Sequence, residues 1–229
     1  MVSLKGGKSS TVTFEILEEE PGTYTVKING QTGIVTVKKS GCLIATATYG
    51  SELSPQVNFL RHFRDEAVLS TFAGTNFMAV FNTWYYSFSP IVASNIANTE
   101  PLRGLMKGIL YPLIGSLRLS SAVFSLFSYN PELGILIAGL VASSLISIIY
   151  VLPFSLLFSI LRRVTPSERI IKLTGLVWVG SLITIFLAEA STSSLLMMAS
   201  TGILVLATMW LTTLVVVRSI TRRTLALIA

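Results

Sequence analysis

Charged residues are scarce in this sequence: they make up 12% of the 229 residues, about half the share of a typical soluble domain. The single cysteine, Cys42, excludes an internal disulfide and a cysteine-based zinc site. The formal net charge is +6, but no run of basic residues is interleaved with aromatics, which argues against nucleic-acid binding. No phosphate loop, nucleotide fingerprint or His-Glu-x-x-His motif is present, so we expect no cofactor and no metal.

Apolar residues, in contrast, make up 52% of the sequence and form three long runs near its end, at 133–161, 170–188 and 195–217. A helix needs about 20 apolar residues to cross a bilayer, so these runs predict three transmembrane helices with the lipid bilayer as their partner. The first run is longer than one crossing requires, and we expect it to tilt or to kink at Pro153.

Basic residues lie at only one end of these runs, at Arg162, Arg163, Arg218, Arg222 and Arg223. The turn at 189–194 contains no cation. Positive charge gathers on the cytoplasmic side of membrane proteins. We therefore expect a protein of the cell membrane, with residues 162–172 and the C-terminus in the cytoplasm and residues 1–132 outside.

Small residues recur four positions apart in the first run, as Gly134, Ala138 and Ala142 in one row and Gly139, Ser143 and Ser147 in another. Such rows let helices approach closely in lipid, either in a homo-oligomer or against the chain's own second and third runs. No run has a charge at its centre, which argues against a conventional transporter. Frequent serine and threonine, including Ser144, Thr208, Thr212 and Thr213, leave a homo-oligomeric pore as an alternative.

The beginning of the chain has the pattern of strands. Apolar and polar residues alternate at 12–16, 24–28 and 35–37, which is typical of half-buried strands. Pro21-Gly22 and Asn29-Gly30 separate these segments and predict tight turns. Residues 1–40 are thus expected to form a small antiparallel β module, which is marginal as an independent unit.

The segments that begin at Gly7, Thr11, Pro21 and Asn29 resemble the closing strands of CARDB-type immunoglobulin-like adhesion domains of archaea and bacteria. Such a sandwich has about seven strands. The resemblance implies that the missing strands come from upstream sequence or from an envelope protein partner. Because residues 1–10 lack the apolar core of a signal peptide, we expect that the native start lies upstream of Met1 or that a partner gene supplies the rest.

A second set of short motifs follows the β module. They are Cys42-Leu43-Ile44-Ala45-Thr46-Ala47, Tyr49-Gly50-Ser51, Leu60-Arg61, Phe63-Arg64-Asp65, Tyr85-Tyr86, Ser89-Pro90 and Leu102-Arg103. Together they resemble the CFI-box domain of prokaryotic surface proteins over residues 42–116. In this chain Leu43 stands where the family usually has phenylalanine, and three apolar runs follow the motifs. The resemblance implies an exported protein and a role in sorting, processing or anchoring.

Cys42 has three interpretations. It is a buried structural thiol, a site of lipid modification or cross-linking to another chain, or a nucleophile. The only histidine, His62, lies about twenty positions away, and no Asp/His pair is placed to orient it. We expect His62 to be a surface or packing residue.

Aromatic residues cluster after this motif, at Phe81, Trp84, Tyr85, Tyr86 and Phe88. Trp and Tyr collect at the membrane–water interface, so we interpret the cluster as an interface-lying platform rather than an ordinary core. The amphipathic segment at 105–127 contains Lys107 and Arg118, which suit a helix in the headgroup region.

The fold class predicted is a membrane α-helical bundle of three transmembrane helices (131–229), with an amphipathic helical collar (41–130) and a small N-terminal antiparallel β module (1–40). The leading hypothesis for function is a non-enzymatic cell-envelope protein that anchors or displays the β module and self-assembles. The alternatives are a homo-oligomeric pore and a Cys42-dependent processing or transfer enzyme.

Overall fold

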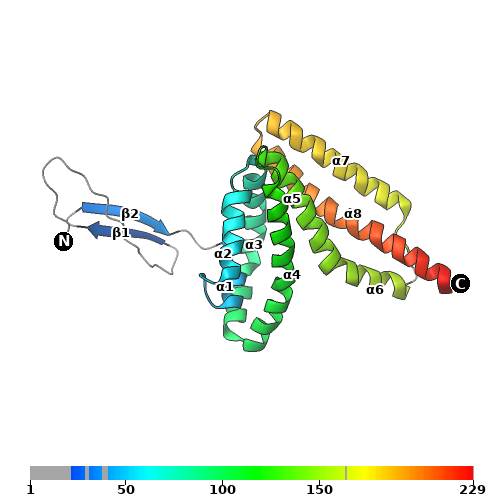
Figure 1. The fold of residues 1–229 in the computed structure, drawn as a ribbon, viewed down its shortest axis with the longest axis horizontal. Helices are drawn as coiled ribbons and strands as arrows, with labels where there is room; N and C mark the ends of the chain where they lie inside the picture. The colour runs from blue at the N-terminus through cyan, green and yellow to red at the C-terminus, as the bar shows by residue number, and fades with distance from the viewer. Residues whose placement is uncertain (1–21, 29–30, 38–40, 163, 229) are drawn as a thin grey trace. The chain divides into compact units, whose positions relative to one another are not determined.

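The computed structural model describes residues 22–28, 31–37, 41–162 and 164–228. The chain divides into two compact units, Met1–Gly41 and Cys42–Ala229. The strands belong to the first unit, and all the helices that the structure describes belong to the second (Figure 1). The boundary expected between residues 130 and 131 therefore falls inside a single compact unit.

The first unit contains an antiparallel hairpin of β1 (Gly22–Ile28) and β2 (Gln31–Val37). Tyr24 pairs with Val35, and alternate residues on either side of this pair share its face. The pairing confirms the two strands expected on either side of Asn29-Gly30. The strand expected at 12–16, like the rest of the β motif before residue 22, lies outside the described residues.

Two layers of helix follow the β unit. The first consists of α1 (Leu43–Tyr49), α2 (Pro55–His62), the π-helical η1 (Phe63–Val68), α3 (Phe72–Asn98) and α4 (Glu100–Ser125). Ser54 caps α2, since its hydroxyl accepts a hydrogen bond from the Val57 N–H at 3.4 Å. Thr71 caps α3 by accepting from the Gly74 N–H at 3.1 Å.

The second layer consists of α5 (Pro131–Ile146), the π-helical η2 (Ser147–Val151), α6 (Leu152–Arg162), α7 (Glu168–Ala190) and α8 (Ser194–Ile228). The long first apolar run thus departs from α-helical geometry in the turn just before Pro153. Proline has no N–H and clashes with the preceding turn, which accounts for a π-helical turn at this place.

Four helical segments are long and apolar enough to cross a membrane, one more than the sequence predicted. Three of them are α5 to α6 (Pro131–Arg162), α7 (Glu168–Ala190) and the Ser194–Arg222 part of α8, which match the expected runs. The fourth is α4. Its first turns carry charged residues, but Arg118 is the only charged residue between positions 108 and 125. α4 is thus a candidate span by length and composition, and the interfacial position expected from Lys107 and Arg118 stays a prediction.

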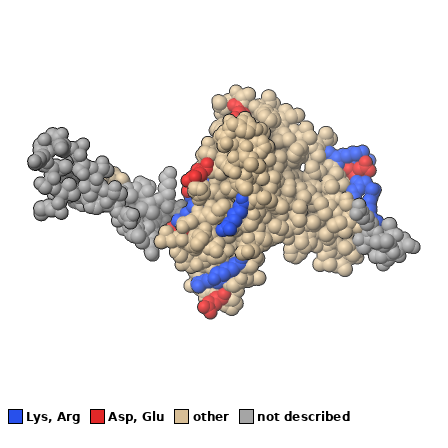
Figure 2. Space-filling model, in the orientation of Figure 1, with Lys and Arg blue, Asp and Glu red and all other residues tan. Residues whose placement is uncertain are grey.

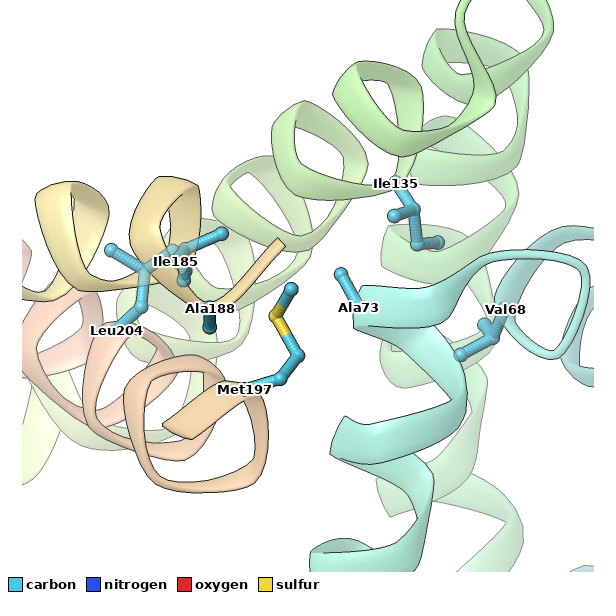
Figure 3. Packing of buried hydrophobic residues seen from close by; sticks show 7 residues of the cluster. All are labelled: Val68, Ala73, Ile135, Ile185, Ala188, Met197 and Leu204. Atoms are coloured by element: carbon cyan, nitrogen blue, oxygen red, sulfur yellow. The ribbon is translucent and has the colours of Figure 1, made fainter. Parts of the chain in front are cut away.

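The two layers meet at one apolar cluster (Figure 3). Ala73 at the beginning of α3 lies there with Ile135 of α5, Ile185 of α7 and Met197 of α8, and all four side chains are at most 8% exposed. From this cluster α3 and α4 run in one direction, whereas α6, α7 and α8 run in another (Figure 1). The cluster therefore joins the helices of the Cys42 region to the three long apolar segments.

Charged side chains gather at the opposite end of α6, α7 and α8, where the end of α6 and the beginning of α7 lie (Figure 2). Glu168 accepts there from Lys172 at 2.9 Å and from Arg218 at 3.2 Å, which ties the beginning of α7 to α8. The surface between this end and the apolar cluster carries few charged side chains on the face shown in Figure 2.

Candidate functional site

The candidate site is built around Cys42, which occupies the residue just before α1. Its carbonyl accepts the first helical hydrogen bond from the Thr46 N–H at 2.8 Å. Its thiol is free and half-buried, and it packs against a small apolar cluster that includes Ala45 of α1, Val57 of α2 and Leu110 of α4. Three segments that are far apart in the sequence therefore meet at the cysteine.

The surroundings of Cys42 favour its protonated form. Burial raises the pKa of the thiol, while the guanidinium groups of Arg64 and Arg61 oppose this rise. Reactive cysteines have a lowered pKa, because the thiolate is the nucleophile. Burial outweighs the two cations, so the thiol pKa is raised, as expected for a cysteine that packs rather than reacts.

Tyr85 of α3 holds the beginning of α1 in place. Its hydroxyl oxygen accepts a hydrogen bond from the Ile44 N–H at 3.1 Å, and burial raises the pKa of this hydroxyl. The N–H groups in the first turn of a helix lack intrahelical partners, so this bond satisfies one of them from outside. Tyr86 packs edge-to-face on Tyr85, with ring centroids 5.5 Å apart, and Ser89 one turn further along α3 is fully buried.

The Tyr49-Gly50-Ser51 motif ends α1 and turns the chain. Gly50 has a φ of 78°, in the left-handed region, and its N–H donates to the Thr46 carbonyl at 2.8 Å. This is the usual geometry of a helix C-terminus that ends at glycine. The Ser51 hydroxyl then accepts from the Leu53 N–H at 3.1 Å. These contacts give the motif a structural role, which is to end α1 and to turn the chain toward α2.

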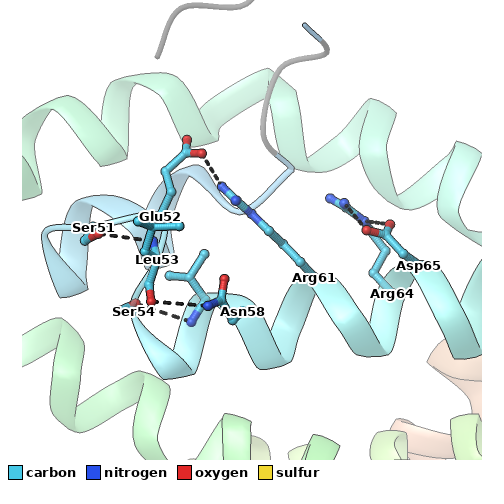
Figure 4. Close-up of polar contacts among 9 residues, drawn as sticks. Ser51, Glu52, Leu53, Ser54, Asn58, Arg61, Arg64 and Asp65 are labelled. Carbon is cyan, nitrogen blue, oxygen red and sulfur yellow. Dashed lines mark hydrogen bonds and ion pairs between the residues drawn. The ribbon is translucent and has the colours of Figure 1, made fainter. Parts of the chain in front are cut away.

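Two ion pairs border the site on the side of α2 (Figure 4). Arg61 donates to Glu52 at 2.7 Å and so bridges the last turn of α2 to the loop before this helix. Arg64 donates to Asp65 through two nitrogens, at 2.7 and 3.0 Å, and this bond lowers the pKa of the Asp65 carboxyl. His62 pairs with Glu66 on the exposed surface at 3.0 Å.

The fold brings most of the predicted motif residues together. Ile44, Ala45 and Tyr49 contact or belong to the cluster beside Cys42, and Tyr85 reaches it from α3. Ala47 and Thr46 lie half-buried on the same short helix. Pro90 is exposed within α3 and is the exception. Among the described residues, no group of three or more His, Cys, Asp or Glu side chains is placed to hold a metal ion.

The small residues of α5 make contacts within the chain. Gly134, Ala138, Ser143 and Ser147 are buried, while Gly139 and Ala142 are half-buried. The Ser147 hydroxyl lies 2.7 Å from the Met209 carbonyl and 2.6 Å from the Thr213 hydroxyl, both on α8. The Ser147 contacts are those expected if the rows pack within the chain, whereas Gly139 has open space around it and leaves self-association through these rows a prediction.

Sequence reasoning missed two residues that act at the beginning of α3: Glu132, which links it to the first long apolar segment, and Gly74, where the chain packs closely on itself. The Glu132 carboxylate, at the beginning of α5, accepts hydrogen bonds from the Phe72 and Ala73 N–H groups at the beginning of α3. A side chain added at Gly74 would collide with the Val68 carbonyl and approach the Thr71 hydroxyl to 2.6 Å. No local sequence pattern indicates the role of Glu132, because this residue binds the N–H of a residue sixty positions away.

Comparison of the chain with protein-family models, curated proteins and solved structures found no match. The resemblances to the CFI-box and CARDB-type domains thus stay predictions that rest on the residues quoted for them.

Proposed function

We propose that the chain is a non-enzymatic membrane protein of the cell envelope, whose long apolar helices anchor a β module outside the cell. One observation carries this proposal. The four candidate spans are apolar, yet only 11–28% of the residues in their most apolar windows are buried within the chain. Exposed apolar area costs about 25 cal/mol per Å² in water. A surface of this kind is stable against lipid and not against water.

The apolar exposure is distributed along α6, α7 and α8. Phe154 is 77% exposed, Leu176 is 70% exposed and Leu206 is 61% exposed. In this proposal α5 to α6, α7 and α8 are the three membrane-spanning segments. The basic end with Arg162, Lys172 and the Arg218 region is cytoplasmic, by the preference of basic residues for that side. The β module and the Cys42 region are then outside.

The Cys42 region acts in this proposal as a collar at the outer ends of the spans. The burial that raises the pKa of the Cys42 thiol supports a structural role for this residue over a nucleophilic one. The link from Glu132 to the beginning of α3 supports a rigid connection between collar and first span. The proposal retains the CFI-box resemblance as an account of why these motifs occur together.

Part of the small-residue rows packs within the chain, as at Ser147, so we propose a further surface for self-association. A groove of about 240 Å³ lies between α7 and α8 and is lined by small residues that include Gly180, Thr184 and Ala199. Small residues allow close approach of a further helix in lipid. We propose this groove as the contact between copies.

The pore alternative has weaker support. Ser147 and Thr213 are hydrogen-bonded to each other, and Thr208 accepts from the Trp178 indole N–H at 2.9 Å. These polar side chains are thus occupied between helices of one chain and do not line an open path there. A conductance measurement on the reconstituted protein would reopen this alternative if it found channels.

The experiment uses the full chain with an epitope tag at its N-terminus, expressed in a prokaryotic host. We expect the protein to stay in the membrane after an alkaline carbonate wash, and added protease to remove the tag from intact cells. Release by carbonate would contradict anchoring, and a tag that is cut only after lysis would contradict the external β module. A purified protein that is strictly monomeric in nanodiscs would contradict self-assembly.

A further inference from the structure

The helical collar contains a long stretch without charged residues. Residues 67–99 contain no Asp, Glu, Lys, Arg or His, although the fifteen residues before them, 52–66, contain six. This stretch includes all of α3 (Phe72–Asn98). Charged residues of the collar lie instead on α2 and η1, among them Arg61 and Asp65, and on α4 at Glu100, Arg103, Lys107 and Arg118. The uncharged helix α3 therefore differs strongly in polarity from the segments just before and after it in the chain.

One face of α3 begins in contact with the spans and then continues uncovered. Ala73 is 2% exposed and lies in the cluster with residues of α5, α7 and α8. Val80, Trp84 and Ile91 follow Ala73 at intervals that place them on the same face of a helix. They are 41%, 61% and 69% exposed. The face that packs on the spans thus becomes an exposed apolar face where the spans diverge from α3.

The opposite side of α3 is covered by α1. Tyr85 reaches the Ile44 N–H of α1, and Ser89 and Ile96 are fully buried one and three turns further along. The helix is therefore not exposed all round. Its uncovered face is the one that points toward the side of the spans, and its covered face is the one against which the uncharged helix α1 packs.

The same pattern recurs on α4. Phe124 packs against the apolar cluster and against Gly134 of α5, and Ser116 on this face is 5% exposed. Ile109 and Leu105 lie on the same face further from the cluster, and they are 41% and 61% exposed. The Tyr150 hydroxyl of η2 donates to the Ile109 carbonyl and so links this part of α4 to the first span. Beyond η2 the chain runs away from α4 (Figure 1).

We propose that Val80, Trp84, Ile91, Leu105 and Ile109 form one membrane-resting face, and that its partner is the bilayer leaflet in which α7 ends and α8 begins. Continuity identifies this partner. The face starts where α3 and α4 touch helices that are themselves apolar enough to lie in lipid, and it contains no charge. Tryptophan is a preferred residue at the headgroup boundary.

The basic residues of α4 leave this face free of charge. Lys107 is two positions from both Leu105 and Ile109 and therefore lies on the opposite side of α4, and the Arg103 guanidinium donates to the Ala97 carbonyl at 2.8 Å. Helices in the membrane interface bury their apolar face about 5–10 Å deep and keep their charged residues on the other side. The α3–α4 hairpin therefore rests on the leaflet, while α1 and α2 face water. This inference rests on the proposed function, because it requires that α5 to α8 lie in the membrane.

The test reads the depth of Trp84 by fluorescence quenching. The chain has three tryptophans, so the double variant Trp178→Phe and Trp210→Phe leaves Trp84 alone. The full chain is reconstituted in phosphatidylcholine vesicles that carry bromine either near the carbonyl end or near the terminal methyl end of the acyl chains. We expect loss of Trp84 fluorescence chiefly with bromine near the carbonyl end, and little loss with aqueous iodide.

The matched control carries Trp84→Phe and Trp178→Phe, which leaves Trp210 within α8. Bromine quenching of Trp210 together with iodide quenching of Trp84 would overturn the membrane-resting face and leave the anchor proposal standing. Absence of bromine quenching at both positions would overturn both. Protection of Trp84 from iodide and bromine alike would also overturn the inference, since a second copy or another protein would then cover the face.

A second measurement serves if the loss of Trp178 prevents folding. A nitroxide is attached at Ile91→Cys in a Cys42→Ser chain, and its collisions with oxygen and with a water-soluble nickel complex are compared. Oxygen partitions into lipid, so we expect the oxygen effect to exceed the nickel effect. A larger nickel effect would overturn the proposal.

Discussion

Removal of the Glu132 carboxylate should loosen the beginning of α3. This carboxylate accepts from the Phe72 N–H and, at 3.2 Å, from the Ala73 N–H. Both donors belong to the first turn of a helix and have no intrahelical partner. Water cannot replace the carboxylate well, because Ala73 is only 2% exposed. In the variant Glu132→Ala we therefore expect the local stability of this turn to fall by about 2 kcal/mol, the range for hydrogen bonds to a charged group.

Hydrogen exchange measures this loss at the Thr75 amide, which donates to the Thr71 carbonyl at 3.0 Å. A loss of about 2 kcal/mol corresponds to about thirtyfold faster exchange when opening is at equilibrium. The control is Glu100→Ala, which removes an exposed acidic residue from the first turn of α4. Exchange at Thr75 that is as slow in Glu132→Ala as in the control would refute the role given to Glu132.

Three further predictions concern packing and the cysteine. Gly74→Ala should destabilise the protein by more than about 2 kcal/mol, because the added methyl group would collide with the Val68 carbonyl. The control Gly115→Ala has open space around it and should be neutral or stabilising by up to about 1 kcal/mol. Thermal melts of the two variants measure the difference. Near neutral pH, Cys42 should react with iodoacetamide more slowly in the folded protein than in the unfolded chain, because its thiol pKa is raised. Arg64→Ala should slow this reaction further, because loss of the cation raises the thiol pKa again. A faster reaction in the variant would contradict this. Ser147→Ala should lower stability in detergent by about 0.6 kcal/mol, a typical value for a hydrogen bond between helices in a membrane protein.

The raised pKa of the Cys42 thiol also makes the stability of the protein depend on pH. The pKa of the thiol is raised in the folded protein. The protonated form therefore contributes stability that is fully present below the unfolded pKa of about 8.5 and is lost as pH rises through the higher folded pKa. We expect wild-type stability to fall more steeply than that of Cys42→Ser in this alkaline range, as measured by melting at a series of pH values.

The sequence was informative where one pattern repeats over many residues. The three apolar runs end within a few residues of α5 to α6, of α7 and of the Ser194–Arg222 part of α8, because length and charge largely decide whether a helix tolerates lipid. The hairpin β1–β2 followed from alternation around Asn29-Gly30. Pro153 indicated the region of η2 correctly, since proline acts on the turn that precedes it.

The sequence was less informative where contacts are distant. The sequence patterns did not single out α4 as a candidate span, because Lys107 and Arg118 interrupt its apolar residues. Arg118 places its guanidinium over the Phe59 ring of α2 at 5.4 Å, a contact that no local pattern shows. The convergence of Cys42 and Tyr85 likewise depends on how α1 packs against α3, which spacing in the sequence does not reveal.

The most direct test of the central claim is to determine, by cysteine labelling, on which side of the membrane each turn lies. In a Cys42→Ser chain, one cysteine is placed in the turn between α7 and α8 as Thr192→Cys, or before α7 as Pro166→Cys. Intact cells are then treated with a maleimide that cannot cross membranes. The account predicts labelling at position 192 in intact cells and at position 166 only after lysis. Labelling of both positions in intact cells, or of position 166 alone, would contradict it.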